Sequence, residues 1–108
     1  MKLLDTKSVK VGKLEFYVRL TNRAVIGYET LTGRNFWVDF GGDELNNEKL
    51  TQLFYTTAKA GARQKGITFE YTYEEFLDIT DDYPEAAAFF YQAIKGPDEE
   101  GEVEKKKK

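Results

Sequence analysis

The sequence predicts a single small α+β domain, in which an N-terminal β-hairpin is followed by three to four α-helices. Two patterns support this: hydrophobic residues alternate with period two near the start of the chain, and they recur at helical spacing after residue 21. The length of 108 residues is that of one domain. We expect residues 1–96 to form this domain and residues 97–108 to form a disordered charged tail.

The hairpin is expected within residues 8–20. Val9 and Val11 alternate with polar residues before Gly12-Lys13, and a second alternating run extends from Leu14 to Leu20. Period-two alternation is typical of a strand with one buried and one exposed face, and the glycine between the two runs favours a turn. We therefore expect two antiparallel strands that bury one face.

The first two helices are expected on either side of an irregular stretch. Thr21-Asn22 can cap a helix of about three turns, and Gly33 is placed to end it in a left-handed conformation. Residues 34–45 predict a loop or a short strand that covers one end of the core. The longest helix is expected over about residues 47–65. Gly61 inside it indicates either close packing against another helix or a tolerated weak position.

Two shorter helices are expected to complete the domain. Thr72-Tyr73-Glu74-Glu75 is a capping box, in which the threonine hydroxyl and the second glutamate each accept a backbone N–H. The helix that it starts is predicted to end near Thr80. Pro84 suits the first turn of the last helix, and Gly96-Pro97 ends that helix.

Composition excludes several classes of protein. The chain has no cysteine and no histidine, so it lacks a disulfide framework, a thiolate zinc site and the commonest general base. No run approaches the ~20 apolar residues of a membrane span, and the N-terminus lacks the apolar stretch of a signal peptide. We therefore expect a cytoplasmic protein with no membrane partner. Residues 1–96 carry 12 basic and 14 acidic residues, and this balance argues against a nucleic-acid partner.

The polar clusters have ordinary structural explanations. Three aspartates within residues 78–82 lack the spacing of a calcium loop, and a helix dipole favours carboxylates before a helix start. Glu74 and Glu75 point about 100° apart on a helix, and Gly41-Gly42 lacks the further residues of a phosphate-binding loop. We therefore expect no catalytic residue, no cofactor and no metal, and the chain is predicted not to be an enzyme.

Aromatic residues are the main candidates for function. The chain has 8 Phe, 7 Tyr and 1 Trp, more than so small a domain is expected to bury completely. Tyr and Trp are over-represented at protein-binding hot spots, whereas core aromatics with partial exposure are the alternative explanation. The candidate protein-binding surface consists of Phe36, Trp37, Phe40, Tyr55, Tyr73 and Tyr91.

The order of the segments resembles that of a known family. The relevant stretches are Phe16 to Asn22, Tyr28-Glu29, Leu31 to Gly33, Leu53 to Ala58, and Tyr73 to Asp78. In this order and spacing they resemble the tail assembly chaperones of long-tailed phages and gene transfer agents. The likeness covers roughly residues 9–95.

The resemblance implies a non-catalytic function in phage or prophage tail assembly. Members of that family are thought to coat the tape measure protein, keep its hydrophobic surface soluble and recruit tail tube subunits. The tape measure protein is therefore the expected partner, with tail tube subunits as a second partner and self-association as a further option. The family also makes an extended product by ribosomal frameshifting, so Lys105 to Lys108 either mark an A-rich slippery site or form a simple tail.

Two other classes of protein stay open. A small regulatory or inhibitory domain would also bind another protein and would have a similar composition. A nucleic-acid-associated protein would use the basic residues Arg19, Arg23, Lys59 and Arg63. We expect no DNA binding, because the chain as a whole has no basic excess.

Overall fold

The chain opens with a two-stranded antiparallel hairpin, as predicted. The computed structural model describes residues 6–42 and 45–95. β1 spans Lys7–Val11 and β2 spans Leu14–Val18. One face of the hairpin is buried through Val9, Val11, Phe16 and Val18. Leu14 departs from the alternation: it is 40% exposed, because it lies next to the turn.

Five helices follow the hairpin in the described part of the chain. They are α1 (Asn22–Thr32), α2 (Phe36–Asp39), α3 (Asn47–Lys65), α4 (Tyr73–Thr80) and α5 (Ala86–Lys95). The α+β class and the four predicted helical segments are confirmed, and α2 is an additional helix. The predicted disordered tail, residues 97–108, lies outside the described residues.

The short helix α2 corrects the prediction for residues 34–45. A loop or short strand was expected there because Asn35 to Phe40 is apolar enough for a strand and Gly41-Gly42 breaks it, but Phe36–Asp39 form one helical turn. The Asn35 side chain caps this turn by accepting a hydrogen bond of 3.0 Å from the Val38 amide. A local cap of this kind competes successfully with the strand preference of aromatic side chains.

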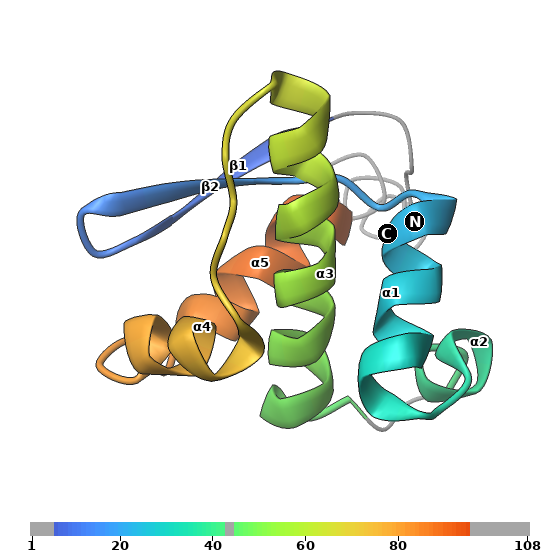
Figure 1. Cartoon of the computed structure of the whole chain (residues 1–108). Coiled ribbons are helices and arrows are strands. Elements are labelled where there is room, and N and C mark those ends of the chain that lie inside the picture. The colour runs from blue at the N-terminus through green and yellow to red at the C-terminus, as the bar shows by residue number, and fades with distance from the viewer. Residues whose placement is uncertain (1–5, 43–44, 96–108) are drawn as a thin grey trace, which may run out of the picture.

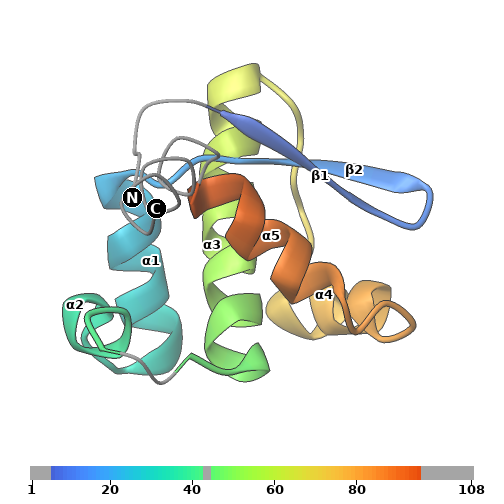
Figure 2. The ribbon, with the colours of Figure 1, turned by 180° about the vertical axis from the view of Figure 1, so that it is seen from behind.

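Helix α3 forms the centre of the fold. It runs between α1 and α4, with the hairpin and α5 behind it (Figure 1), and Figure 2 shows α5 crossing its far side. Ten of its residues are buried, because the helix is covered on several sides. Phe54 at its centre stacks on Phe90 of α5 with ring centroids 4.9 Å apart. The core is therefore organised around α3.

Gly61 allows α3 to contact the hairpin backbone. A Cβ atom placed on Gly61 would lie 1.9 Å from the Tyr17 carbonyl oxygen and 2.8 Å from the Val18 nitrogen. Close packing is therefore the reason for this glycine, but the neighbour is strand β2 rather than another helix. Nearby, the Arg19 amide donates a 3.1 Å hydrogen bond to the Thr57 carbonyl, which ties the end of β2 to α3.

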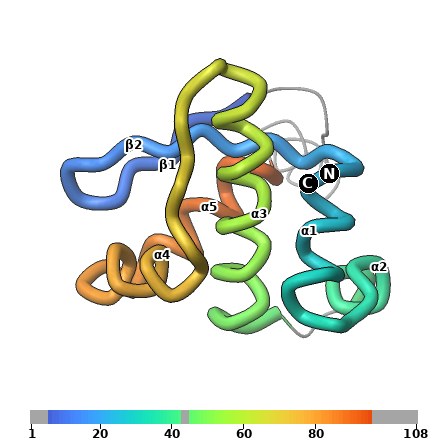
Figure 3. The backbone as a smooth tube through the Cα atoms, in the orientation of Figure 1, coloured from blue at the N-terminus to red at the C-terminus, as the bar shows by residue number. Residues whose placement is uncertain are grey.

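The predicted capping signals are found at the end of α1 and at the start of α4, whereas α5 begins at Ala86, two residues after Pro84, and its predicted stop at Gly96-Pro97 lies outside the described residues. Gly33 ends α1 in the left-handed conformation, with φ of 72°. Thr72 and Glu75 form the complete capping box at the start of α4, with hydrogen bonds of 3.1 and 2.8 Å. Between α3 and α4, residues 67–72 form an extended link that lies along α3 (Figure 3).

Candidate protein-binding groove

The six aromatic residues predicted to form a surface are divided between core and surface. Trp37 is 67% exposed, while Phe40, Tyr73 and Tyr91 are half-buried. Phe36 and Tyr55 are only 1% and 7% exposed, so neither ring is the exposed surface residue that was predicted: Phe36 lies in the core, and Tyr55 is largely covered although it borders the groove described below.

The physical reason lies in the packing of these two rings. Phe36 contacts Tyr28 and Phe40, with ring centroids 6.0 and 5.0 Å away. Tyr55 packs its ring against Phe69 and donates a 2.6 Å hydrogen bond from its hydroxyl to the Tyr71 carbonyl. A tyrosine can be buried in this way once its hydroxyl has an acceptor.

The six residues also do not form one continuous surface. Phe36 and Trp37 belong to α2 and Phe40 follows it, whereas Tyr91 lies on α5, where Lys95 is placed over its ring. Tyr55 and Tyr73 are neighbours, with ring centroids 5.4 Å apart, and both border a groove on the opposite side of α3 from α5. This groove is the candidate binding site.

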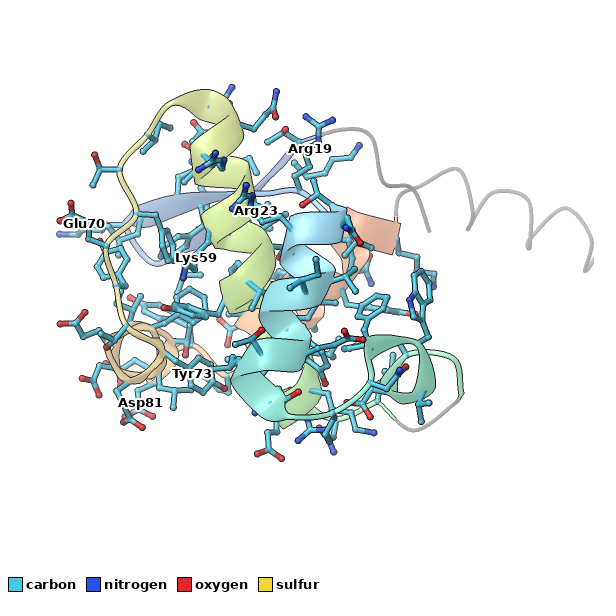
Figure 4. All side chains as sticks on the ribbon, turned by 45° about the vertical axis from the view of Figure 1, so that its right-hand side comes forward. Arg19, Arg23, Lys59, Glu70, Tyr73 and Asp81 are labelled. Carbon is cyan, nitrogen blue, oxygen red and sulfur yellow. The ribbon has the colours of Figure 1, made fainter. Side chains whose placement is uncertain are left out.

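The groove, which we call the α1–α3 groove, has a volume of about 800 Å³. Its floor is the outer face of α3, one wall is α1, and the other wall is the extended link with the start of α4 (Figure 4). The lining residues on the floor are Tyr55, Thr56, Lys59, Ala60, Ala62 and Arg63. The walls consist of Arg23, Ile26, Gly27, Thr30 and Leu31 from α1, and of Ile67, Phe69, Thr72 and Tyr73.

The charge of the groove lining is entirely positive. Arg23, Lys59 and Arg63 contribute to it, and the lining contains no aspartate or glutamate. Lys59 lies over the Tyr55 ring at 5.4 Å from its centroid. Figure 4 shows Arg23 and Lys59 between α1 and the link, while Glu70 and Asp81 lie on the outer side of the link and below α4. The part of the groove that holds Arg23, Lys59 and Arg63 thus favours an anionic group.

The groove also exposes large apolar side chains. Ile26 is 52% exposed, Ile67 is 46% exposed and Leu31 is 37% exposed. Ile26 belongs to the α1 wall and Ile67 to the link wall, and the floor includes the small residues Thr56 and Ala60. Exposed apolar groups gathered in a concave surface are typical of binding sites.

A polar network holds the α1 wall in place. The Tyr28 hydroxyl donates a 2.6 Å hydrogen bond to Asp39 Oδ2, and Arg34 Nε donates to the same oxygen at 2.8 Å. Arg34 Nη2 also donates to Gln52 Oε1 of α3 at 2.8 Å. The network therefore links α1, α2 and α3.

The network shifts the pKa values of its members. The hydrogen bond from Tyr28 and then that from Arg34 hold the pKa of Asp39 below its usual range. Burial and the hydrogen bond to Asp39 raise the pKa of Tyr28 to about 12. Both groups are thus held in the protonation states that they have at neutral pH, which suits a structural role.

The sequence identified the cations of the groove but assigned them to another class of ligand. Arg23, Lys59 and Arg63 belong to the set considered for nucleic acid, and all three line the groove, while Arg19 lies beyond its upper end (Figure 4). Ile26 and Ile67 were not identified. Ile26 could have been noticed because it falls outside the stripe formed by Ala24 and Tyr28, the buried residues of α1.

Other kinds of site have no support in the described residues. Within residues 6–42 and 45–95, no three His, Cys, Asp or Glu side chains gather closely enough to hold a metal ion. None of the helices in those residues has the length and apolar character needed to cross a membrane.

Comparison with known proteins does not reveal a relative: no family model matches the chain, and neither does any curated protein or solved structure.

Proposed function

We propose that this chain is a non-catalytic assembly chaperone that binds an apolar segment of another protein. The observation that carries the proposal is the α1–α3 groove, in which Ile26, Leu31 and Ile67 remain exposed beside three cations. Apolar side chains with a polar surround are typical of protein-binding surfaces. Covering them with the apolar face of a client removes both surfaces from water, and this requires neither ATP nor a catalytic residue.

The proposed client is a phage tape measure protein, with tail tube subunits as a second partner. The resemblance of residues 9–95 to the tail assembly chaperones supports this choice, as does the small size of the domain. Trp37 and Val38 on α2 are 67% and 74% exposed and do not line the groove, so they provide a separate contact for a second partner. The proposed location is the cytoplasm of the bacterial host.

The test begins in the genome that encodes the chain. We expect a tail tube gene upstream and a very long gene, rich in coiled-coil sequence, downstream. Co-expression with the chain should increase the soluble fraction of the long product and yield a complex that survives purification. If both genes are present and the long product is equally soluble with and without the chain, the chaperone function is wrong.

The gene itself tests the frameshift hypothesis for Lys105 to Lys108, which lie outside the described residues. An A-rich heptamer together with an overlapping downstream frame is expected. If either is missing, the lysine run is a simple tail.

A small regulatory or inhibitory domain is the alternative, because the same groove would serve to block an enzyme. In that case the chain would recover a host enzyme in a pull-down and have no effect on the long product. Nucleic acid is not proposed, since the net charge of the chain is −3 and the cations of the groove alternate with apolar side chains. A salt-dependent gel shift with DNA is expected to show no binding.

A further inference from the structure

We infer that the α1–α3 groove binds a helix of about three turns whose apolar face is flanked by carboxylates. This inference rests on the proposed function and specifies the chemistry of the client segment. It depends on three properties of the groove: the direction of its walls, the absence of acidic lining residues and the positions of its exposed apolar side chains.

The walls and floor suit a helix. α1 and α3 lie side by side and run in opposite directions (Figure 1), and the α3 floor residues Thr56, Lys59, Ala60 and Arg63 follow the spacing of one helical face. The 11 residues of α1 set the length of the groove, about 16 Å at ~1.5 Å per residue. A third helix laid along this pair is the helix-in-groove arrangement.

Small side chains on the floor of the groove leave space for an incoming helix. A Cβ atom on Gly27 would lie 3.6 Å from Thr56 Cβ, so α1 and α3 approach closely at this point. Ala60 lies one turn further along the floor. Ile26 and Ile67 rise on either side, and they would contact the apolar residues of an incoming helix. A helix satisfies its own backbone hydrogen bonds, so it covers these side chains without burying unpaired polar groups.

The charges select an acidic occupant. Arg23 lies near the start of α1 and Arg63 near the end of α3, and because the two helices are antiparallel both guanidinium groups lie toward the same end of the groove. Lys59 lies one turn before Arg63 on the floor. The net charge of the whole chain is −3. A preference for an acidic ligand therefore has to come from the groove and not from the overall charge.

The experiment compares two blocked peptides of about 14 residues that are helical and have the same leucine stripe. One carries glutamate on both sides of the stripe and the other carries lysine at the same positions. Fluorescence anisotropy with the full chain should show the glutamate peptide binding about tenfold more tightly than the lysine peptide. Amide shifts should map to α1, α3 and residues 67–72. A glutamate peptide with a central proline should bind about tenfold or more weakly than its parent, because proline breaks the helix.

Matched variants assign the preference to the groove. The variant R23Q/K59Q/R63Q should lose the preference for glutamate, while K7Q/K10Q/K13Q, which removes the same charge from the hairpin, should keep it. Ile67→Ser leaves the charge unchanged and should weaken binding of both peptides. Circular dichroism of each variant establishes that it is folded before binding is measured.

The opposite results overturn the inference. Equal binding of the two charged peptides, no binding of the glutamate peptide, equal binding of the proline peptide, or shifts confined to α2 or the hairpin would each contradict it. The acidic residues of 98–104 are a competing occupant. If their replacement by the corresponding amides strengthens peptide binding about tenfold, the groove belongs to the chain's own tail instead. If the long client is solubilised but the peptides are not distinguished, the chaperone function stands and the groove is not its site.

Discussion

Two glycines inside helices show how strongly a single position depends on its neighbour. A side chain at Gly61 would collide with the backbone of β2, at 1.9 Å from the Tyr17 carbonyl oxygen. A methyl group at Gly27 would meet Thr56 at 3.6 Å, which is ordinary van der Waals contact. The two positions have the same helical conformation, so the difference between them comes from packing alone.

We therefore predict opposite effects of alanine at these two positions. Gly61→Ala should lower the free energy of unfolding by about 1–3 kcal/mol or more, because β2 has to move away from α3. Gly27→Ala should raise it by up to about 1 kcal/mol, because alanine favours the helix and fits the available space. Urea denaturation of both variants measures these changes. A stable Gly61→Ala variant would contradict the contact between α3 and β2.

The network around Asp39 predicts how stability depends on pH. Since the pKa of Asp39 is lowered in the folded state, its contribution is present above the ordinary value of about 3.9 and is lost as the pH falls through the folded value. Asp39→Asn should be less stable than the wild type at pH 7, and its stability should change less between pH 4 and 2. Urea denaturation across this range provides the comparison. Parallel pH profiles for the two proteins would contradict the role of Asp39.

At high pH, ionisation of Tyr28 should lower the stability of the fold. Its pKa is raised to about 12, so the stabilisation is complete below the ordinary value of about 10 and is lost as the pH rises through 12. The Tyr28→Phe variant should therefore lose less stability than the wild type as the pH rises toward 12. The difference between the ultraviolet titrations of the tyrosinate band in the wild type and in Tyr28→Phe measures the shift of Tyr28, because the chain has 7 Tyr.

At the scale of elements, helix α2 separates two adjacent aromatic residues. Phe36 is 1% exposed and packs under Tyr28, whereas Trp37 is 67% exposed. Sequence alone treated the two residues alike, because both are large and aromatic. The capping residue Asn35 and the single turn that follows decide which of them points inward.

We predict that alanine substitutions at these two positions of α2 will have very different effects on stability. Phe36→Ala should lower the free energy of unfolding by about 3–5 kcal/mol, which is typical of a buried phenylalanine. Trp37→Ala should cost less than about 1.5 kcal/mol, because its main loss is the ring contact with Phe36 at 4.8 Å. Thermal unfolding compares the two. Equal losses would show that Trp37 is part of the core.

Trp37 is also the only tryptophan, so its fluorescence reports on α2 alone. The free chain should have the red-shifted emission of an exposed indole. A blue shift on adding a partner would assign α2 to the interface.

The helix ends that could be predicted from the sequence are those marked by capping or terminating residues close by in the chain. The capping box at Thr72 and the terminating glycine at Gly33 act within a few residues, and both were found as predicted. Burial of Phe36 and Tyr55 depends on residues far away in the chain, such as Tyr28 and Tyr71, and no local pattern encodes it. The groove also depends on distant parts of the chain. Its cations were identified in the sequence, but only the antiparallel arrangement of α1 and α3 brings them to one surface.

At the scale of the whole molecule, one side of the central helix α3 is packed against other elements and the opposite side lines the proposed binding groove. On one side α3 is covered by the hairpin and α5 (Figure 2), and on the other it forms the floor of the α1–α3 groove. The hairpin and α5 therefore pack against the helix whose opposite face is proposed to bind the client. This division explains why α3 is buried along most of its length and still exposes Lys59 and Arg63.

The dissociation constant between the chain and its co-expressed client tests this central claim most directly. We expect R23Q/K59Q/R63Q to bind the client about tenfold more weakly than the wild type, and the hairpin variant K7Q/K10Q/K13Q to bind it as tightly as the wild type. Equal affinities of the wild type and the groove variant for the client, with both proteins folded, would contradict the claim that the α1–α3 groove is the binding site.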